Sequence, residues 1–335
     1  MKNVLLTGGL GYIGSHVVIE LIEAGYHPVI YDNLTNSHLS VLSNLVDITN
    51  TDIKFVKGDV RDKVLLNDTL EQYSIKAVIH LAGLKAVSES LKNPLEYYDN
   101  NVLGTVTLLQ ALSDRCIKKL VFSSSATVYG EPKYLPLNEL HPIAPINPYG
   151  KSKTQVEEIL YDVSYADSVW DIVVLRYFNP IGAHLSAVLG ESPKDTPANL
   201  MPHILNAGLN ECDTIKIFGD DYDTPDGTCI RDFIHVVDLA KGHVAALNSL
   251  GNRQNKFSVF NLGTGKGTSV KSLIETFEKI SGIVLKKSTE SRRDGDSAMS
   301  YACVKKAEDE LGWRASMSID QMVESAWLFA QNKKK

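Results

Sequence analysis

Cysteine is scarce in this chain, and the few thiols lie far apart. The 335 residues include four cysteines, Cys116, Cys212, Cys229 and Cys303, with no CxxC pair among them. Disulfide-stapled scaffolds and zinc ribbons need denser or closer cysteines, so both classes are excluded. We expect buried free thiols in a reducing compartment. The nine histidines form no HExxH or comparable ligand set, and we predict no metal site.

Long apolar runs and blocks of basic residues are also missing. No uninterrupted apolar stretch reaches about 18 residues, the length of a spanning helix, and the N-terminus enters an apolar run at Val4 without the pattern of a signal peptide. The sequence therefore predicts a cytoplasmic protein with no membrane partner. The net charge is −6, and the one basic block, Lys333-Lys334-Lys335, is expected to be a solvated tail. This balance does not indicate a nucleic-acid partner.

A glycine-rich segment near the N-terminus is the first sign of function. The octapeptide Thr7-Gly8-Gly9-Leu10-Gly11-Tyr12-Ile13-Gly14 lies between the apolar run 4–6 and a helical pattern that ends at Gly25. Glycines at intervals of three let bare N–H groups approach a pyrophosphate, which the positive end of the following helix also attracts. The pattern predicts a dinucleotide site. Taken alone, an ordinary glycine-rich turn is the alternative.

An acidic residue after the next apolar run supports a dinucleotide. Asp32 follows the run 28–31, where a carboxylate can accept hydrogen bonds from an adenosine ribose. Because the same charge would repel a 2′-phosphate, we expect NAD and not NADP. An aspartate that closes a strand is also a common turn residue.

Apolar runs alternate with helical patterns, as in a doubly wound parallel sheet. After Pro180 the sequence becomes richer in loops, and one later run, 257–262, is expected to return to the first sheet. We predict an α/β Rossmann domain that binds NAD over 1–180, with a return segment at about 235–263. A smaller interleaved α/β domain over the rest of 181–335 would hold the substrate. The earlier runs are 4–6, 28–31, 53–56, 77–81, 119–122 and 172–175.

The segment from Asn147 to Lys153 carries the catalytic signal. Asn147 followed by proline favours a helix start, and the spacing of later apolar residues places Tyr149 and Lys153 on one sheet-facing stripe. A lysine on a buried stripe is costly without partners, which favours a function over a snorkelling lysine. Forming a tyrosinate near neutral pH takes about 4 kcal/mol. Lys153 and the cationic nicotinamide of NAD⁺ could supply it.

A serine at the predicted end of the fifth strand could assist this base. The tyrosinate could take a hydroxyl proton as hydride leaves the same carbon, and Ser125 could share that hydroxyl and relay the proton. A strand-end serine that caps backbone groups is the alternative. For Ser123 and Ser124, residue type favours capping.

These motifs resemble one family. Tyr149-x-x-x-Lys153 and Thr7-Gly8-x-x-Gly11-x-x-Gly14 are similar to the extended short-chain dehydrogenase/reductase superfamily. Over nearly its whole length the chain resembles the UDP-glucose (UDP-galactose) 4-epimerase family. The segments that carry this resemblance are 81–87, 94–101, 122–130, 175–180, 199–202, 227–238 and 292–296.

The resemblance implies a role for each matching residue. Tyr149 is the implied base, Lys153 lowers its pKa and holds the nicotinamide ribose, and Ser125 is the hydroxyl partner. Arginine forks also fit a diphosphate on chemical grounds, with a surface salt bridge as the alternative. The other implied NAD contacts are Gly8, Gly11, Tyr12, Ile13, Gly14, Asp32, Asn33, Asp59, Val60, Lys85, Asn100, Ser123, Tyr177 and Phe178. The other implied nucleotide-sugar contacts are Asn179, Asn199, Leu200, Ile217, Phe218, Arg231, Arg293 and Asp296.

The implied reaction interconverts UDP-glucose and UDP-galactose through a 4-keto sugar. Hydride passes from sugar C4 to tightly held NAD⁺ while Tyr149 takes the 4-hydroxyl proton, and the ketone then turns and receives the hydride on its other face. Two alternatives stay open. A nucleotide-sugar 4,6-dehydratase shares the first step but resembles a Thr-Asp-Glu pattern where this chain has Ser125-Ala126-Thr127. A non-catalytic NAD-sensing protein would not need Tyr149 and Lys153.

Ser300 separates two branches of the family that the chain resembles. Epimerases restricted to unacetylated sugars resemble one another in carrying a bulky tyrosine at this position, and relatives that accept N-acetylated sugars look small there. We therefore predict activity on UDP-N-acetylglucosamine and UDP-N-acetylgalactosamine as well. The alternative is that Ser300 caps a turn and Met299 fills the space.

The resemblance also implies a homodimer with a helix-bundle interface. The helical stretch 101–112 shows Val102, Val106, Leu109 and Leu112, and it could pair with the helix after Pro148 across a symmetric interface. Alternatively, both helices only pack on the sheet.

Overall fold

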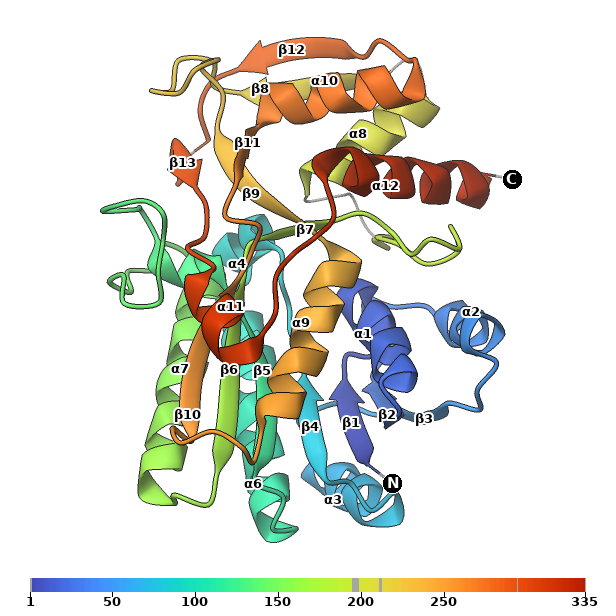
Figure 1. The fold of residues 1–335 in the computed structure, drawn as a ribbon, viewed down its shortest axis with the longest axis vertical. Coiled ribbons are helices and arrows are strands. Elements are labelled where there is room, and N and C mark those ends of the chain that lie inside the picture. The colour runs from blue at the N-terminus through green and yellow to red at the C-terminus, as the bar shows by residue number, and fades with distance from the viewer. Residues whose placement is uncertain (1, 195–198, 211–212, 294, 335) are drawn as a thin grey trace.

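A parallel β-sheet lies at the centre of the larger part of the molecule (Figure 1). The structure is a computed structural model that describes residues 2–194, 199–210, 213–293 and 295–334. The strands of the sheet are β1 (Asn3–Thr7), β2 (His27–Asp32), β3 (Lys54–Lys57), β4 (Ala77–His80), β5 (Lys119–Ser125), β6 (Asp171–Tyr177) and β10 (Phe257–Leu262). Their order across the sheet is β10-β6-β5-β4-β1-β2-β3, and all neighbours are parallel.

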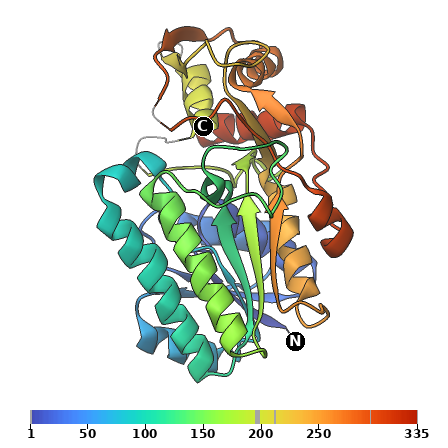
Figure 2. The ribbon, with the colours of Figure 1, turned by 90° about the vertical axis from the view of Figure 1, so that its left-hand side faces the viewer.

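Helices cover both faces of this sheet (Figures 1 and 2). The helices and helical turns of this larger part are α1 (Tyr12–Glu23), α2 (Ser40–Thr49), α3 (Lys63–Gln72), α4 (Val87–Lys92), α5 (Pro94–Tyr97), the π-helical turn η1 (Tyr98–Leu103), α6 (Gly104–Asp114), the 3₁₀ turn η2 (Ala126–Tyr129), α7 (Pro148–Ala166), α9 (Val236–Ser249) and α11 (Lys305–Leu311). Leu6 and Val121 lie in the core under α1 and α9, whereas Leu5 and Phe122 lie in the core under α6 and α7. Two covered faces explain why the strands are apolar almost without interruption.

A smaller part lies beyond the carboxyl ends of these strands (Figure 1). Its strands form two small sheets, in which β9 pairs with β7, β11 and β13, and β8 pairs with β12. Its core includes Ile204, Phe277 and Trp327. The elements are β7 (Asn179–Ile181), α8 (Leu200–Leu209), β8 (Thr214–Phe218), β9 (Ile230–His235), β11 (Gly267–Ser269), α10 (Val270–Ser281), β12 (Lys286–Glu290), β13 (Met299–Ser300) and α12 (Ile319–Lys334).

The predicted α/β fold with a doubly wound parallel sheet is confirmed. The later apolar run is β10, which pairs with β6 and places Phe260 opposite Leu175. The chain thus returns to the large sheet after it has built β7, β8 and β9. We keep the division into 1–180 with about 235–263 and the remainder of 181–335 as a proposal.

The cysteines differ in exposure, which corrects one expectation. Cys229 is buried, but Cys303 is only half-buried and Cys116 is exposed. Cys116 lies in the turn between α6 and β5 with a positive φ of 55°, and such turns run over the surface. Cys212, like Asp294 and Lys335, lies outside the described residues. Of the helices that the structure describes, none combines the length and the apolar character needed to cross a membrane.

Candidate active site

The glycine-rich segment forms a tight cradle between β1 and α1. Gly8 has a φ of +70°, and a Cβ there would lie 2.8 Å from the backbone nitrogen of Ala82. A Cβ on Gly14 would lie 2.2 Å from the carbonyl oxygen of Gly8. Gly11 precedes α1 and offers no side-chain cap, so the first N–H groups of the helix remain suited to an anion. These observations fit a dinucleotide pyrophosphate.

Asp32 fastens the cradle to the end of β2. Its buried carboxylate accepts hydrogen bonds from the backbone N–H of Leu10 at 3.1 Å and of Leu34 at 2.9 Å. The hydroxyl of Ser37 also donates to it, at 2.8 Å. The carboxylate therefore stabilises the turn after β2, which was the alternative role considered for Asp32. A carboxylate has about four acceptor positions, and three are used here. One position remains for a ribose hydroxyl.

The residues predicted to contact the adenosine lie just after β2 and β3. They are Asn33, Asp59 and Val60. The amide of Asn33 donates to Asp59 at 3.0 Å, and Val60 is buried. Hydrogen bonds from Arg61 hold the pKa of the Asp59 carboxyl well below its usual range. The charged acceptor is thus maintained where the adenine contacts are predicted.

Tyr149, Lys153 and Ser125 meet where β5 ends and α7 begins. The side chain of Asn147 accepts the N–H of Gly150 at 2.8 Å and caps α7, as its residue type predicts. Lys153 is buried and donates to the carbonyl of Ser123 at 2.8 Å. Lys153 therefore points towards the sheet, as predicted.

Ser125 both caps backbone and faces the base. Its hydroxyl oxygen accepts from the backbone N–H of Thr127 at 3.2 Å and from the Thr127 hydroxyl at 3.0 Å. Since a hydroxyl has two acceptor positions and one proton, that proton remains free to be donated. A hydrogen bond with Ser125 lowers the pKa of Tyr149. The two roles considered for Ser125 are thus compatible.

The protein alone does not lower the pKa of the phenol, which differs from the expectation for Lys153. Burial raises the pKa of Tyr149, and this effect is larger than that of the Ser125 hydrogen bond. Burial also lowers the pKa of Lys153 to about 8, while the charge of Glu157 raises it. The ammonium group of Lys153 is bonded to the Ser123 carbonyl. A cationic nicotinamide nearby would favour the tyrosinate.

A buried ion pair supports the catalytic helix from behind. Glu157 lies one turn after Lys153 and receives the guanidinium of Arg176 at 2.6 Å, with both side chains almost fully buried. Arg176 also donates to the hydroxyl of Tyr129 at 3.1 Å. Ser124 donates to Glu157 and does not cap backbone as its residue type suggested. The network ties β5, β6 and α7 together beneath the site.

The other predicted NAD contacts line the carboxyl edge of the same sheet. Asn100 is half-buried within η1, and π-helical turns are frequent at functional sites. Tyr177 is buried and its hydroxyl lies 2.7 Å from Nε2 of His243, while Phe178 packs against Tyr129. Ser123 lies 3.5 Å from the same histidine nitrogen, so it too is not a backbone cap.

Two arginines of the smaller part share one carboxylate. Asp296 lies 2.8 Å from Nε of Arg293 and 3.5 Å from Arg231. The guanidinium of Arg293 lies 4.8 Å above the ring of Phe218, beside half-buried Ile217. Among these three described side chains, one carboxylate faces two guanidinium groups, so their summed charge is positive. A diphosphate with an attached planar base suits such a surface.

The remaining predicted sugar contacts lie in β13, in β7 and at the start of α8. Ser300 in β13 pairs in register with Arg231, so its side chain lies beside the cationic cluster. Asn179 begins β7 and is exposed. Asn199 precedes α8, in which half-buried Leu200 is the first residue. Lys85 and Asn199, which are assigned to the two halves of the predicted site, both donate to Glu191.

Three acidic residues of this region were not among the predicted site residues, and two of them have no signal in the sequence. Glu191 accepts from both Lys85 and Asn199. Asp232 accepts the backbone N–H groups of Ala302, just after β13, and of Thr264 and Gly265 in the turn after β10. Glu157 was detectable only through its spacing of four from Lys153.

The described residues hold no group of three or more His, Cys, Asp or Glu side chains suited to a metal ion.

Both a family model and a relative of known name match this chain over nearly its whole length. The sequence model of the family described as GDP-mannose 4,6 dehydratase matches residues 5–326. A UDP-glucose 4-epimerase from Dictyostelium discoideum is 50% identical over 325 residues, which are 97% of this chain and 94% of the relative.

Two solved structures agree with this relationship. A UDP-glucose 4-epimerase from Bifidobacterium longum in complex with NAD⁺ and UDP is 48% identical, with a TM-score of 0.95 and 99% of each chain covered. A UDP-glucose-4-epimerase from Stenotrophomonas maltophila, with bound NAD and formylated UDP-arabinopyranose, is 43% identical. Its TM-score is 0.97, and 100% of this chain and 99% of that chain are covered.

Proposed function

This chain belongs to the UDP-glucose 4-epimerase family of the extended short-chain dehydrogenases/reductases, and from this premise we propose that it interconverts UDP-glucose and UDP-galactose through a 4-keto sugar. NAD is its cofactor. The observation that carries the proposal is that Tyr149 is hydrogen-bonded to Ser125, with Lys153 buried on the same helix. The experiment that tests it is conversion of UDP-galactose to UDP-glucose by protein purified without added NAD.

The site residues divide the work between chemistry and anchoring. Bound NAD⁺ supplies a hydride acceptor, and later a donor, for C4 of the sugar. Tyr149 Oη takes the proton of the 4-hydroxyl and returns it after the ketone has turned. The hydroxyl of Ser125 keeps its proton and donates a hydrogen bond to the sugar O4. Arg231 and Arg293 hold the diphosphate, so the keto sugar can turn without being released.

Dehydration is the weaker alternative despite the name of the matching family model. A 4,6-dehydratase needs an acid and a base near C5 and C6 to eliminate water. Here Ala126 follows Ser125 and has no titratable group, and the hydroxyl of Thr127 is bonded to Ser125. The full-length relatives named above are epimerases.

We propose that the sugar pocket also admits N-acetylated hexoses. Ser300 lies in β13 opposite Arg231, which we assign to the diphosphate. A serine leaves out the volume of an aromatic ring at this place. The 2-acetamido group should therefore have room while the ketone turns.

Ser300→Tyr is expected to reduce activity selectively on the acetylated sugars. In a closely packed pocket the added ring would overlap the acetamido group and cost about 1 to 3 kcal/mol, which corresponds to roughly 5- to 150-fold. The measurement is kcat/KM on UDP-N-acetylgalactosamine and on UDP-galactose, and the unacetylated sugar is the internal control. Equal loss on both sugars, or no wild-type activity on the acetylated one, would reject the proposal.

We propose a homodimer whose interface includes only part of the predicted apolar stretch 101–112. Leu109 and Leu112 are buried in the core of their own chain and cannot reach a partner. By contrast, Leu91, Leu95 and Leu103 are exposed on the adjoining elements α4, α5 and η1. Contiguous exposed apolar side chains mark interaction surfaces.

Sedimentation is expected to give a mass near twice that of one chain. Leu95→Glu should shift the mass towards the monomer, because a charge would be buried at the interface without a partner. Val64→Glu, at an apolar side chain exposed on α3, is the matched control and should leave the mass unchanged. A wild-type mass near that of one chain would count against the dimer.

Cytoplasmic location is proposed on composition alone. The thiols of Cys116, Cys229 and Cys303 are free, as is usual in a reducing compartment. A UDP-hexose epimerase there would place the chain in galactose metabolism.

A further inference from the structure

One carboxylate joins the NAD side of the site to the sugar-nucleotide side. Oε1 of Glu191 lies 3.0 Å from Nζ of Lys85 and 2.7 Å from the amide nitrogen of Asn199. Lys85 follows β4, at the edge that holds the cofactor residues, and Asn199 precedes α8 in the smaller part. The side chain of Glu191 is only 10% exposed. A charge that is so little exposed to solvent is costly unless it is paired. Both partners of Glu191 are residues that the proposed function assigns to ligand binding.

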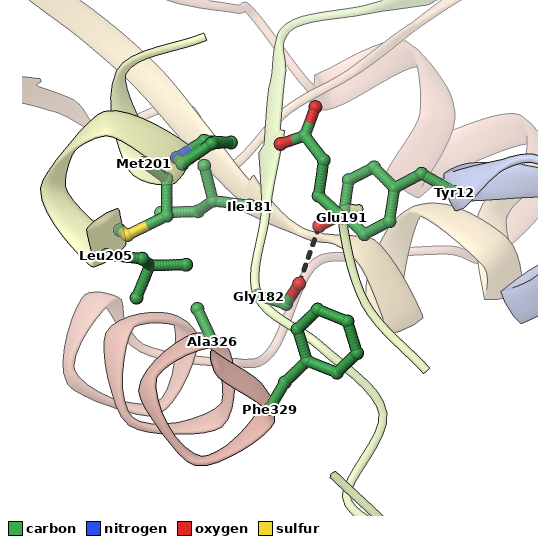
Figure 3. Close-up of a pocket in the computed structure, with 9 residues that line it drawn as sticks. Tyr12, Ile181, Gly182, Glu191, Met201, Leu205, Ala326 and Phe329 are labelled. Atoms are coloured by element: carbon green, nitrogen blue, oxygen red, sulfur yellow. Dashed lines mark hydrogen bonds between the residues drawn. The ribbon is translucent and has the colours of Figure 1, made fainter. Parts of the chain in front are cut away.

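The surroundings of Glu191 connect it to the glycine cradle as well. Figure 3 shows its carboxylate beside the ring of Tyr12, whose hydroxyl donates to the carbonyl of Gly182 at 2.7 Å. Lys85 Nζ lies 6.0 Å from the centroid of the same ring. Burial and, to a lesser extent, the charge of Glu191 raise the pKa of Tyr12. Tyr12 therefore stays a neutral hydrogen-bond donor, and the cluster carries one carboxylate and one ammonium.

The segment that carries Glu191 is fixed on both sides. A Cβ on Gly190 would lie 2.5 Å from the ring of Phe329, so this backbone packs directly on α12. Lys194 donates to the carbonyls of Leu34 at 2.6 Å and Thr35 at 3.2 Å, just after β2. These contacts hold the segment between the two parts of the molecule. The carboxylate is thus placed by its backbone and is not merely attracted to a surface lysine.

We propose that Glu191 is a positioning residue that couples NAD binding to UDP-sugar binding, by orienting Lys85 and Asn199 with one oxygen atom. The inference rests on the proposed function, because that function assigns Lys85 to NAD and Asn199 to the nucleotide sugar. The role assigned to Glu191 is exerted through these two side chains. Glu191 acts by fixing two donors that would otherwise be mobile, which reduces the ordering cost of binding.

Two substitutions at Glu191 separate its two contacts. Glu191→Gln keeps an oxygen that can accept from Asn199 but removes the charge that pairs with Lys85. Glu191→Ala removes both contacts. We expect faster loss of NAD from both variants, whereas UDP affinity should fall about tenfold only in Glu191→Ala. Glu278→Gln changes another lysine-paired glutamate, bonded to Lys287 at 2.7 Å on the smaller part, and is the matched control.

The readouts are UDP binding by calorimetry and NAD retention by absorbance after gel filtration. Asn199→Ala should weaken UDP binding in the wild-type background and have little further effect in Glu191→Ala, since Glu191 acts on UDP through Asn199. The proposal would be overturned if Asn199→Ala and Glu191→Ala weakened UDP binding additively. It would also be overturned if Glu191→Gln and Glu191→Ala gave the same UDP affinity and the same NAD retention. Wild-type turnover is measured in parallel, so that absence of epimerase activity is recognised as failure of the proposed function and not of the role of Glu191.

Discussion

Tyr149→Phe is expected to lower turnover at least about 10²-fold, as for loss of a general base. The phenylalanine ring keeps the shape of the side chain but has no oxygen to take the 4-hydroxyl proton. Ser125 cannot replace it, because a serine hydroxyl is a far weaker acid than a phenol and both its acceptor positions are engaged by Thr127. The fold and the bound NAD should be retained, since only one hydroxyl is removed.

The measurement is kcat on UDP-galactose together with the NAD content of the purified variant. Tyr161→Phe is the matched control, because Tyr161 lies on the same helix with an exposed side chain and should leave kcat unchanged. If Tyr149→Phe kept turnover within a factor of two of the wild type, another group would be the base.

Glu157→Ala is expected to destabilise the protein by about 3 to 5 kcal/mol, the usual cost of breaking a buried ion pair on one side. Its carboxylate accepts two donors of Arg176 and the hydroxyl of Ser124. Without it the guanidinium would stay buried beside Tyr129 with no counter-charge. The variant should also lose activity, because α7 carries Tyr149.

The stability change is measured by urea denaturation followed by circular dichroism. Glu158→Ala is the matched control: it removes an exposed carboxylate from the next position of the same helix, and its effect should stay within about 0.5 kcal/mol. If Glu157→Ala also changed the free energy of unfolding by less than about 0.5 kcal/mol, the buried ion pair would contribute little to stability.

The sequence could predict the parts of this site that depend on local spacing. The glycine cradle lies within one turn between a strand and a helix, and Tyr149 and Lys153 lie one helical turn apart. In such cases residue type and interval determine the geometry. Asp32 was predictable for the same reason, since it directly follows an apolar run.

Contacts between distant segments could not be predicted from residue type alone. Ser124 bonds to Glu157, Glu191 joins residues far apart in the chain, and Lys153 donates to a backbone carbonyl and not towards Tyr149. These partners are brought together only by the packing of the sheet, so no interval in the sequence indicates them. Arg231 and Arg293 were assigned through the family resemblance, since their chemistry alone also suits a surface salt bridge.

Internal return of hydrogen at C4 is the central claim, and heavy water tests it most directly. Protein purified without added NAD is incubated with UDP-galactose in D₂O, and the sugar protons are followed by nuclear magnetic resonance. We expect UDP-glucose to form with its original hydrogen at C4, because the hydrogen that leaves the carbon never exchanges with solvent. Deuterium at C4 of the product, or no conversion until NAD is supplied, would contradict it.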